Sequence, residues 1–314
     1  MAGSASTALR SAFVTETTQG TTVATPAFKT LHEPILFTDA QKRMGQPSLV
    51  AGGALVGDSL LYREYVGKIS AAPVVYGLYD TFFESLFQAA FSSNVLNDGK
   101  AASFFTVENT IPNGVGGASK MKRYTGVEAV GGSIAVDARG GVTMDMDFIG
   151  ISGIGYTGTA IVGSTYTDPS NNDPFSATTD VGAVTFAGMT LDDIASAKID
   201  FTYDGKVPQP KVGTDDLVGI ARGAYQPIIT LKCYVGTNYS TNSDAARAQT
   251  QTAAKVTVNM GSITLKKYKW EFNLCYLDSA MSDFSGANGF ITLVLRANYS
   301  TSTSSVMTLT RAVV

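Results

Sequence analysis

Two glycine-rich segments are the first places where residue spacing in this sequence suggests chemistry. Gly153, Gly155 and Gly158 match GxGxxG, a pattern in which the amides of a following helix hold a pyrophosphate. Residues 159–173 predict a loop, so no helix is expected to receive phosphates there. Residues 114–120 are similar to a phosphate loop but lack the Gly-Lys-Ser/Thr ending. We therefore interpret the first segment as purely structural and the second as a flexible turn.

The histidine, cysteine and acidic residues do not combine into a catalytic set. His32 is the single histidine, and we interpret it as an ordinary, partly buried side chain because no nucleophile elbow accompanies it. Cys233 and Cys275 lie in strand-like apolar runs, which favours buried free thiols over zinc ligands. Asp145 and Asp147 share one face of one predicted strand, which more often marks a solvated face than an acid–base pair. We expect no enzyme, cofactor or metal site.

Composition narrows the function classes further. A hydrophobic fraction of 44% over 314 residues is enough for a substantial core, whereas charged residues make up only 16%. The formal net charge is −3 and the basic residues are scattered, so the basic patch that grips nucleic-acid phosphates is missing. Neither a signal peptide nor an apolar run of membrane-helix length is visible. We expect a protein made and assembled in a cytoplasm.

Hydrophobic patterning predicts a mainly β protein with one clear helix in its first half. Residues 79–91 carry an apolar stripe at helical spacing, with Asp80 as an N-cap or first-turn acid, and the stripe should pack on a sheet. The stripe consists of Phe82, Phe83, Leu86, Phe87 and Ala90. Strands are predicted over residues 28–38, 65–75, 102–108, 121–137 and 142–149.

The second half follows the same order of elements, with a weaker helix over residues 243–252. Its strands are predicted over residues 194–203, 225–235, 255–260, 263–277, 290–297 and 306–311. Composition divides the chain into a flexible N-terminal arm (residues 1–27), a first domain (28–150), a linker, surface loop or small insertion (151–185), and a second domain (186–314). Each domain has a segment too long for a simple turn, at residues 39–64 and 204–223.

An internal repeat suggests that the two domains are copies of one β-rich unit. The matching pairs are Ile35 with Ile199, Pro47 with Pro210 and Asp80 with Asp244, at offsets of 164, 163 and 164 residues. The match is one of pattern more than identity. A duplication would let a ring of few chains present many equivalent strands.

In their order and spacing, several segments resemble the major tail tube proteins of long-tailed (siphovirus-like) bacteriophages. They are residues 16–26, Tyr79-Asp80 leading the helix, Thr125-Gly126 before a long strand, the hairpin return over residues 141–150, and residues 308–311. The resemblance covers nearly the whole chain. The long segment over residues 150–182 is a departure from it.

The resemblance implies a structural virion protein that polymerises into stacked rings and forms the conduit for DNA ejection into the host. The expected fold is two tandem tail-tube-type β-sandwich or curled-sheet domains, each with one packed α-helix, contributing strands to a ring-wide β-barrel. The expected partners are further copies of the chain, tail terminator and tail-tip proteins at the ends, and a tape-measure protein and later DNA that pass through the lumen without specific binding. No membrane partner is expected.

Ring symmetry and contact residues follow as hypotheses. The resemblance implies sixfold rings, so two domains per chain favour three chains with pseudo-sixfold symmetry, and six chains are the alternative. The candidate inter-ring residues are apolar residues of the first long segment that need burial: Met44, Leu49, Val50, Leu55, Val56, Leu60 and Leu61. The candidate acidic lumen residues are Asp137, Asp145 and Asp147.

Two other function classes share such β-rich, catalytically silent sequences. One is a ring-forming secretion-system tube component or a capsid-surface (decoration) protein. The other is a carbohydrate-binding or hydrolytic tail protein, against which the single tryptophan, Trp270, and the lack of a paired-carboxylate cleft argue. The shape of the polymer and a glycan-binding assay would separate these classes.

Overall fold

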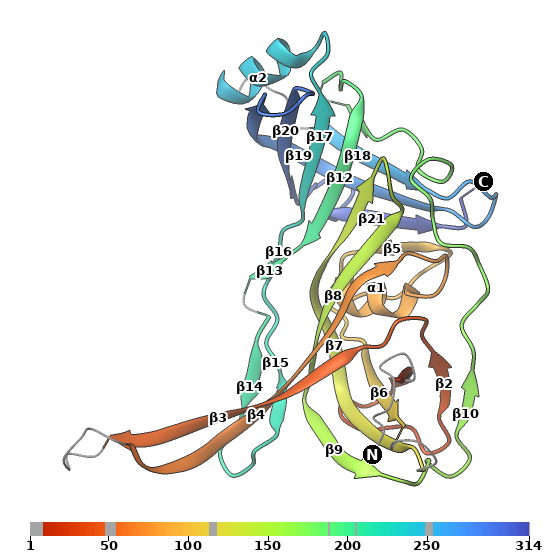
Figure 1. Cartoon of the computed structure of the whole chain (residues 1–314), viewed down its shortest axis with the longest axis vertical. Coiled ribbons are helices and arrows are strands. Elements are labelled where there is room, and N and C mark those ends of the chain that lie inside the picture. Colours follow the sequence, from red (N-terminus) through yellow and green to blue (C-terminus); the bar gives the residue numbers. More distant parts are fainter. Residues whose placement is uncertain are drawn as a thin grey trace.

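The chain folds into an elongated structure built mainly of β-strands. The computed structural model describes residues 9–47, 55–112, 118–187, 189–204, 206–248 and 254–313. Two long hairpins point to one end, helix α1 lies beside the middle, and helix α2 lies at the other end (Figure 1). The prediction of a mainly β fold is confirmed. In the part of the chain described, no helix is long and apolar enough to span a membrane.

The largest sheet runs through both halves of the chain as one antiparallel series. Its order is β3 (Leu36–Pro47), β4 (Leu55–Pro73), β8 (Val142–Gly150), β7 (Lys120–Asp137), β12 (Ile194–Phe201), β17 (Ile228–Tyr234), β20 (Phe290–Asn298) and β19 (Tyr268–Asp283). The halves meet where β12 pairs with the end of β7, with Ser196 opposite Asp137 and Phe201 opposite Gly132. Alternating burial along these strands leaves one apolar and one polar face.

The two halves of this sheet have the same connectivity. In the first half, hairpin β3–β4 is followed by α1 (Asp80–Phe87) and β6 (Phe104–Ile111), and hairpin β7–β8 returns with β8 beside β4. In the second half, β12 and β17 pair, α2 (Tyr239–Ala248) and β18 (Ala254–Met260) follow, and β19–β20 returns with β20 beside β17. The strand orders β3–β4–β8–β7 and β12–β17–β20–β19 are therefore equivalent.

The second helix begins earlier than the sequence predicts. It starts at Tyr239, so Asp244 lies inside α2 and does not open it. Asn238 precedes the helix and donates its backbone and side-chain N–H groups to Asp192, at 3.2 and 3.0 Å. Asn is a residue type preferred just before a helix, and the contact with Asp192 holds Asn238 at that position.

A smaller group of strands covers the apolar face of the first half. β6 pairs with β1 and with the start of β7, β2 pairs with β1, β10 runs parallel to β2, and β9 also pairs with the start of β7. The bounds are β1 (Arg10–Glu16), β2 (Ala27–Thr30), β9 (Ser152–Thr157) and β10 (Thr165–Thr167). Phe105 of β6 packs edge-on against Phe148 of β8, with ring centroids 5.8 Å apart. The two layers enclose one core, as in a β-sandwich.

Strand β1 corrects the expectation of a flexible N-terminal arm for residues 10–16. Phe13 is buried in the core, and β1 pairs with β6 over its whole length. The polar composition concealed the strand because its polar side chains find partners inside the protein. The carboxylate of Glu16 accepts hydrogen bonds from the Thr106 hydroxyl at 2.7 Å and from the Gly126 amide at 2.9 Å.

The segment over residues 151–185 connects the halves and runs along one side of the structure (Figure 1). It contributes β9 and β10 to the outer layer, and β11 (Thr185–Phe186) follows it and pairs with β18. Gly153 and Gly155 lie inside β9, and no helix follows that strand before residue 187. The interpretation of GxGxxG as a structural segment is confirmed. Residues 113–117 of the other glycine-rich segment lie outside the described residues.

Helix α1 provides the centre of the core, as its apolar stripe predicts. Phe82, Phe83, Leu86 and Phe87 are fully buried. The stripe ends sooner than expected, because the chain leaves the helix at Gln88 with φ 54°, which places Ala90 beyond the helix and exposed.

The first turn of α1 is attached to the second half of the chain. The sequence predicted Asp80 to be either the N-cap or an acid of the first turn, and it lies in the first turn. It pairs with Arg311 at 2.5 Å and accepts a hydrogen bond from the Tyr268 hydroxyl. Further along the helix, the rings of Phe83 and Phe87 lie 5.3 and 6.0 Å from that of Trp270.

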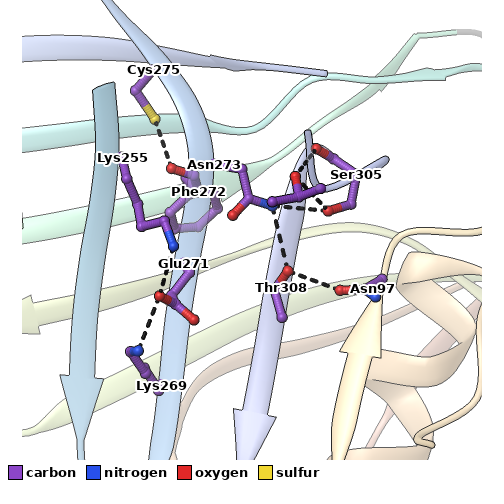
Figure 2. Close-up of polar contacts among 10 residues, drawn as sticks. Asn97, Lys255, Lys269, Glu271, Phe272, Asn273, Cys275, Ser305 and Thr308 are labelled. Atoms are coloured by element: carbon purple, nitrogen blue, oxygen red, sulfur yellow. Dashed lines mark hydrogen bonds and ion pairs between the residues drawn. The ribbon is translucent and has the colours of Figure 1, made fainter. Parts of the chain in front are cut away.

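A second layer closes the other half of the sheet. The first part of β19 leaves β20 and pairs with β18 on one side and β21 (Met307–Arg311) on the other. Strand β21 also pairs with β5 (Val95–Asn97) of the first half. Figure 2 shows this region: Thr308 donates to Asn97 at 2.8 Å, and Lys255 and Lys269 flank Glu271 at 3.1 and 3.0 Å. The pairing of β21 with β5 and the Thr308–Asn97 hydrogen bond attach the last strand of the chain to the first half.

Candidate functional site

The polar face of the main sheet holds the acidic residues that sequence patterning singled out. Asp145 and Asp147 are half-buried and alternate with buried methionines on β8, and Asp137 is exposed at the end of β7. Asp145 lies opposite Ser133, which in turn lies opposite Asp200 of β12. The predicted alternation on β8 is confirmed. The register of β12 on β7 brings a further acid, Asp200 of the second half, to this face; the sequence patterning had not singled it out.

Basic side chains lie among the acids on the same face, and two of them form ion pairs. Lys68 lies opposite the second acid of β8, Lys198 contacts Asp200 at 2.6 Å, and Arg296 contacts Asp278 at 3.0 Å. Lys68, Lys198 and Arg296 sit at alternate, outward-facing positions of their strands. The same alternation of buried and outward positions that marks β8 in the sequence therefore marks these three positions. The face is a polar surface of mixed charge, on which Lys198 and Arg296 are paired.

A hollow of about 420 Å³ lies on this face where β4, β8, β7 and β12 come together. Its lining includes Lys68, Gly132, Asp145, Asp147 and Asp200. Gly132 is required there, because a Cβ atom at that position would lie 2.5 Å from the backbone oxygen of Asp145. The acids lie on neighbouring strands of one surface and not across a cleft. Within the described ranges, no group of three or more His, Cys, Asp or Glu residues is placed to hold a metal ion.

The remaining candidates for chemistry are separated in the fold. His32 is exposed, not partly buried as expected, with Nε2 3.3 Å from the backbone oxygen of Ser170. Cys233 and Cys275 are buried free thiols, as predicted. Burial raises their pKa values to about 11 and about 12, which makes both thiols poor nucleophiles at neutral pH.

The first arm, residues 39–47 and 55–65, is the long segment that the sequence marked as too long for a simple turn, and these residues form two antiparallel strands. β3 and β4 pair from Leu36↔Lys68 out to Pro47↔Leu55, with two register shifts on the way. The backbone groups of such an extension are satisfied by cross-strand hydrogen bonds, which local composition does not reveal. The arm projects well beyond the sandwich (Figure 1).

The first arm carries the residues predicted to contact another ring. Met44 is 62% exposed, Leu61 is 49% exposed and Leu60 is half-buried. Leu49 and Val50 lie outside the described residues, as do the side chains of Leu55 and Val56. On the part that is described, apolar side chains are thus presented to solvent far from the core.

The second arm, residues 203–225, leaves the main sheet between β12 and β17. It consists of β13 (Tyr203–Asp204), β14 (Pro208–Pro210), β15 (Leu217–Ile220) and β16 (Ala224–Tyr225), paired as β13–β16 and β14–β15. It points toward the same end of the molecule as the first arm (Figure 1). The two arms occupy the same place in the two halves, because each extends the first hairpin of its half.

The distal end of the second arm, beside its turn, is fastened to the base of the first arm. Arg63 and Asp215 form an ion pair at 2.9 Å, and the Tyr65 hydroxyl donates to Asp216 at 2.9 Å. Leu217 and Ile220 are buried in a small separate cluster beside β8. The second arm is therefore held against the base of the first arm close to its own turn.

A buried ionic cluster lies under the second arm. Glu128 of β7 is 3.7 Å from the ammonium of Lys206 and 3.2 Å from the guanidinium of Arg222, and Lys206 also donates to the Ala129 carbonyl at 2.6 Å. Burial lowers the pKa of Lys206 to about 8, although Glu128 opposes this shift. Burial raises the pKa of Glu128, and Lys206 and Arg222 oppose that shift.

This cluster predicts a stability that rises with pH. Unfolded lysine keeps its proton up to a pKa near 10.5, whereas folded Lys206 releases it near 8. Between these values the unfolded state binds more protons, so the free energy of unfolding should rise by about 1 to 2 kcal/mol from pH 8 to 9.5. Urea unfolding at several pH values would measure it. Lys206→Met should flatten the rise, and equal slopes in both proteins would contradict this account.

The arrangement of the sheet and the arms indicates the general class of protein to which this chain belongs. The described residues present a long polar sheet face, two arms at one end and continuous strand pairing between repeated units, which are features of a self-associating structural protein. Comparison with known proteins narrows this class. A family model for phage tail tube proteins matches residues 7–301, and the chain belongs to that family. No curated protein matches the chain.

Membership of this family settles the coarse function. The chain is a structural protein of the phage virion tail, it self-assembles into a tube, and it is not an enzyme. The resemblance seen in the sequence is confirmed over nearly the whole chain.

Proposed function

We propose that this protein forms rings of three chains and that each ring has pseudo-sixfold symmetry. The rings stack, and the stack is the conduit through which DNA leaves the virion. Residues 28–150 and 186–314 act as two tandem tube domains in this proposal. The observation that carries it is the repeated strand order, β3–β4–β8–β7 followed by β12–β17–β20–β19, within one continuous sheet. Three such chains supply six equivalent four-stranded units.

The free edges of the sheet support ring closure. Among the described residues, β3 pairs only with β4, and the end of β19 from Ser279 to Asp283 pairs only with β20. Unpaired edges expose backbone donors and acceptors that favour pairing with another chain. Joining β3 of one chain to β19 of the next would continue the same antiparallel order around a closed barrel, which removes both edges.

The polar face suits a lumen. A conduit has to pass phosphate groups without retaining them, which disfavours unpaired basic side chains on its wall. Lys198 and Arg296 are paired with acids, and Asp137, Asp145 and Asp147 add negative charge. The tape-measure protein and later the DNA would pass over this surface without specific binding.

The arms suit contact between successive rings. Both lie at the same end of the chain, and the first arm presents Met44 and Leu61 to solvent, as a surface buried on stacking would. The terminator and tail-tip proteins would meet the two unlike ends of the stack.

End-on electron microscopy of assembled tubes tests this proposal. Threefold averages with six similar lobes per ring are the expected result. Rings with true sixfold symmetry would support the tube function but contradict the proposal of three chains per ring. Monomers under all conditions, even with tail-tip components added as a nucleus, would contradict the tube itself.

A further inference from the structure

A groove lies at the opposite end of the molecule from the arms. It has a volume of about 330 Å³ and is formed by the end of β7, the start of β12 and the segment before β12. β12 begins near the α2 end of the sheet and runs toward the arms, so its first residues and the arm tips are at opposite ends (Figure 1). The groove is therefore out of reach of the arms of its own chain.

The groove combines a small apolar floor with an acidic rim. Its apolar lining includes Ala138, Ala177, Val181, Ala183 and Val184. Asp192 and Asp193 lie on its edge, and Asp193 is exposed. One carboxylate oxygen of Asp192 accepts the hydrogen bonds from Asn238, and the other is buried without a hydrogen-bond partner among the described residues. A buried, unpartnered carboxylate oxygen favours the approach of a cation.

The tip of the second arm has the complementary chemistry. Val212 is 99% exposed, and the neighbouring Lys211 is exposed, with no ion-pair partner within the described ranges. Gly213 turns the chain with φ 90°, a conformation that keeps the tip narrow. An isolated apolar side chain beside a free ammonium, at the end of a hairpin, matches an apolar groove with an acidic rim.

We propose that the tip of the second arm docks into this groove on a second copy of the chain in the adjacent ring. Val212 lies against the apolar floor, and the Lys211 ammonium lies against Asp192 and Asp193. This inference rests on the proposed stacking of rings, and it names the surface that receives the arm. Unlike surfaces at opposite ends make the contact heterologous, and a heterologous contact propagates as an open stack.

Cross-linking in assembled tubes tests the contact directly. The double variant Val212→Cys/Ala183→Cys, treated with a short bismaleimide, should give covalent ladders longer than the three chains of one ring. The native thiols, Cys233 and Cys275, are buried and should stay unmodified. Val162→Cys/Ala183→Cys is the matched control, because Val162 is an 87% exposed valine on a different loop.

The outcomes separate the docking site from the tube function. If the double variant forms tubes without ladders, or cross-links only within single rings, the proposed docking site is wrong. The proposed tube function is then unaffected. If wild-type chains form no tubes, the proposed function fails and the docking site fails with it.

Charge reversal gives an independent readout. Lys211→Asp should raise the concentration needed for tube formation about tenfold or more, and Asp193→Lys added to it should restore most of the loss. Both side chains are exposed, so the monomer should keep its melting temperature. Lys211→Asp tubes that form at the wild-type concentration would overturn the contact.

Discussion

Removal of the first arm, by deleting residues 43–57, is expected to leave a folded chain that no longer forms tubes. Lys42 and Tyr62 face each other in the β3–β4 register, so the deletion leaves Asp58, Ser59, Leu60 and Leu61 as a four-residue hairpin turn. The sandwich core lies elsewhere and should be unaffected. Assembly should fall below detection, because the arm would carry apolar contacts to the next ring in the proposed stack.

Electron microscopy and sedimentation would measure assembly, and circular dichroism would report the fold. The point variants Met44→Asp and Leu61→Asp should weaken assembly in the same direction, because both side chains are exposed on the arm. Val162→Asp is the matched control, since it adds the same charge at another exposed position. If the deletion variant formed long tubes, the first arm would not be required for the stacking of rings.

Replacing Trp270 with alanine is expected to lower the free energy of unfolding by about 3 to 5 kcal/mol. Trp270 is the largest fully buried side chain, and its ring contacts Phe83 and Phe87 of α1 and Phe201 of β12. The substitution opens a cavity where elements from both halves meet. We expect both the lost burial and the incomplete collapse of the cavity to contribute to this loss.

Urea unfolding followed by far-ultraviolet circular dichroism would measure this loss, since the variant lacks the tryptophan fluorophore. Trp270→Phe is the control: it keeps an aromatic ring and removes an indole N–H that has no hydrogen-bond partner in the described part of the chain. It should cost about 1 to 2 kcal/mol, less than the alanine variant. A loss below about 1 kcal/mol for Trp270→Ala would show that this contact does not hold the halves together.

The two halves are joined by more than the Trp270 cluster. β12 pairs with β7, β21 pairs with β5, and Asp80 of the first helix is bonded to Tyr268 and Arg311. In the proposed ring of three chains, these contacts hold two adjacent units in a fixed orientation before assembly. Fewer chains would then have to associate for each ring, which reduces the entropic cost of ring formation.

Local periodicity predicted those parts of the fold that depend on it alone. The apolar stripe of α1 and the alternation on β8 were confirmed because a helix and a half-buried strand each reveal their buried face in sequence spacing. The absence of a basic patch and of a convincing catalytic set is consistent with the family assignment. β1 was missed because its partner β6 is distant in the sequence, and the hairpin form of the first arm was missed because cross-strand hydrogen bonds leave no mark in its composition.

By itself, the sequence determined the mainly β class, the central helix and the acidic positions on β8, since composition and spacing along the chain carry that information. Only the tertiary structure decided which strands lie side by side, because pairing is set by contacts between residues far apart. The register of β12 on β7 brought Asp200 to the face that holds Asp145. The same long-range packing buried Lys206 beside Glu128 and formed the groove between β7 and β12.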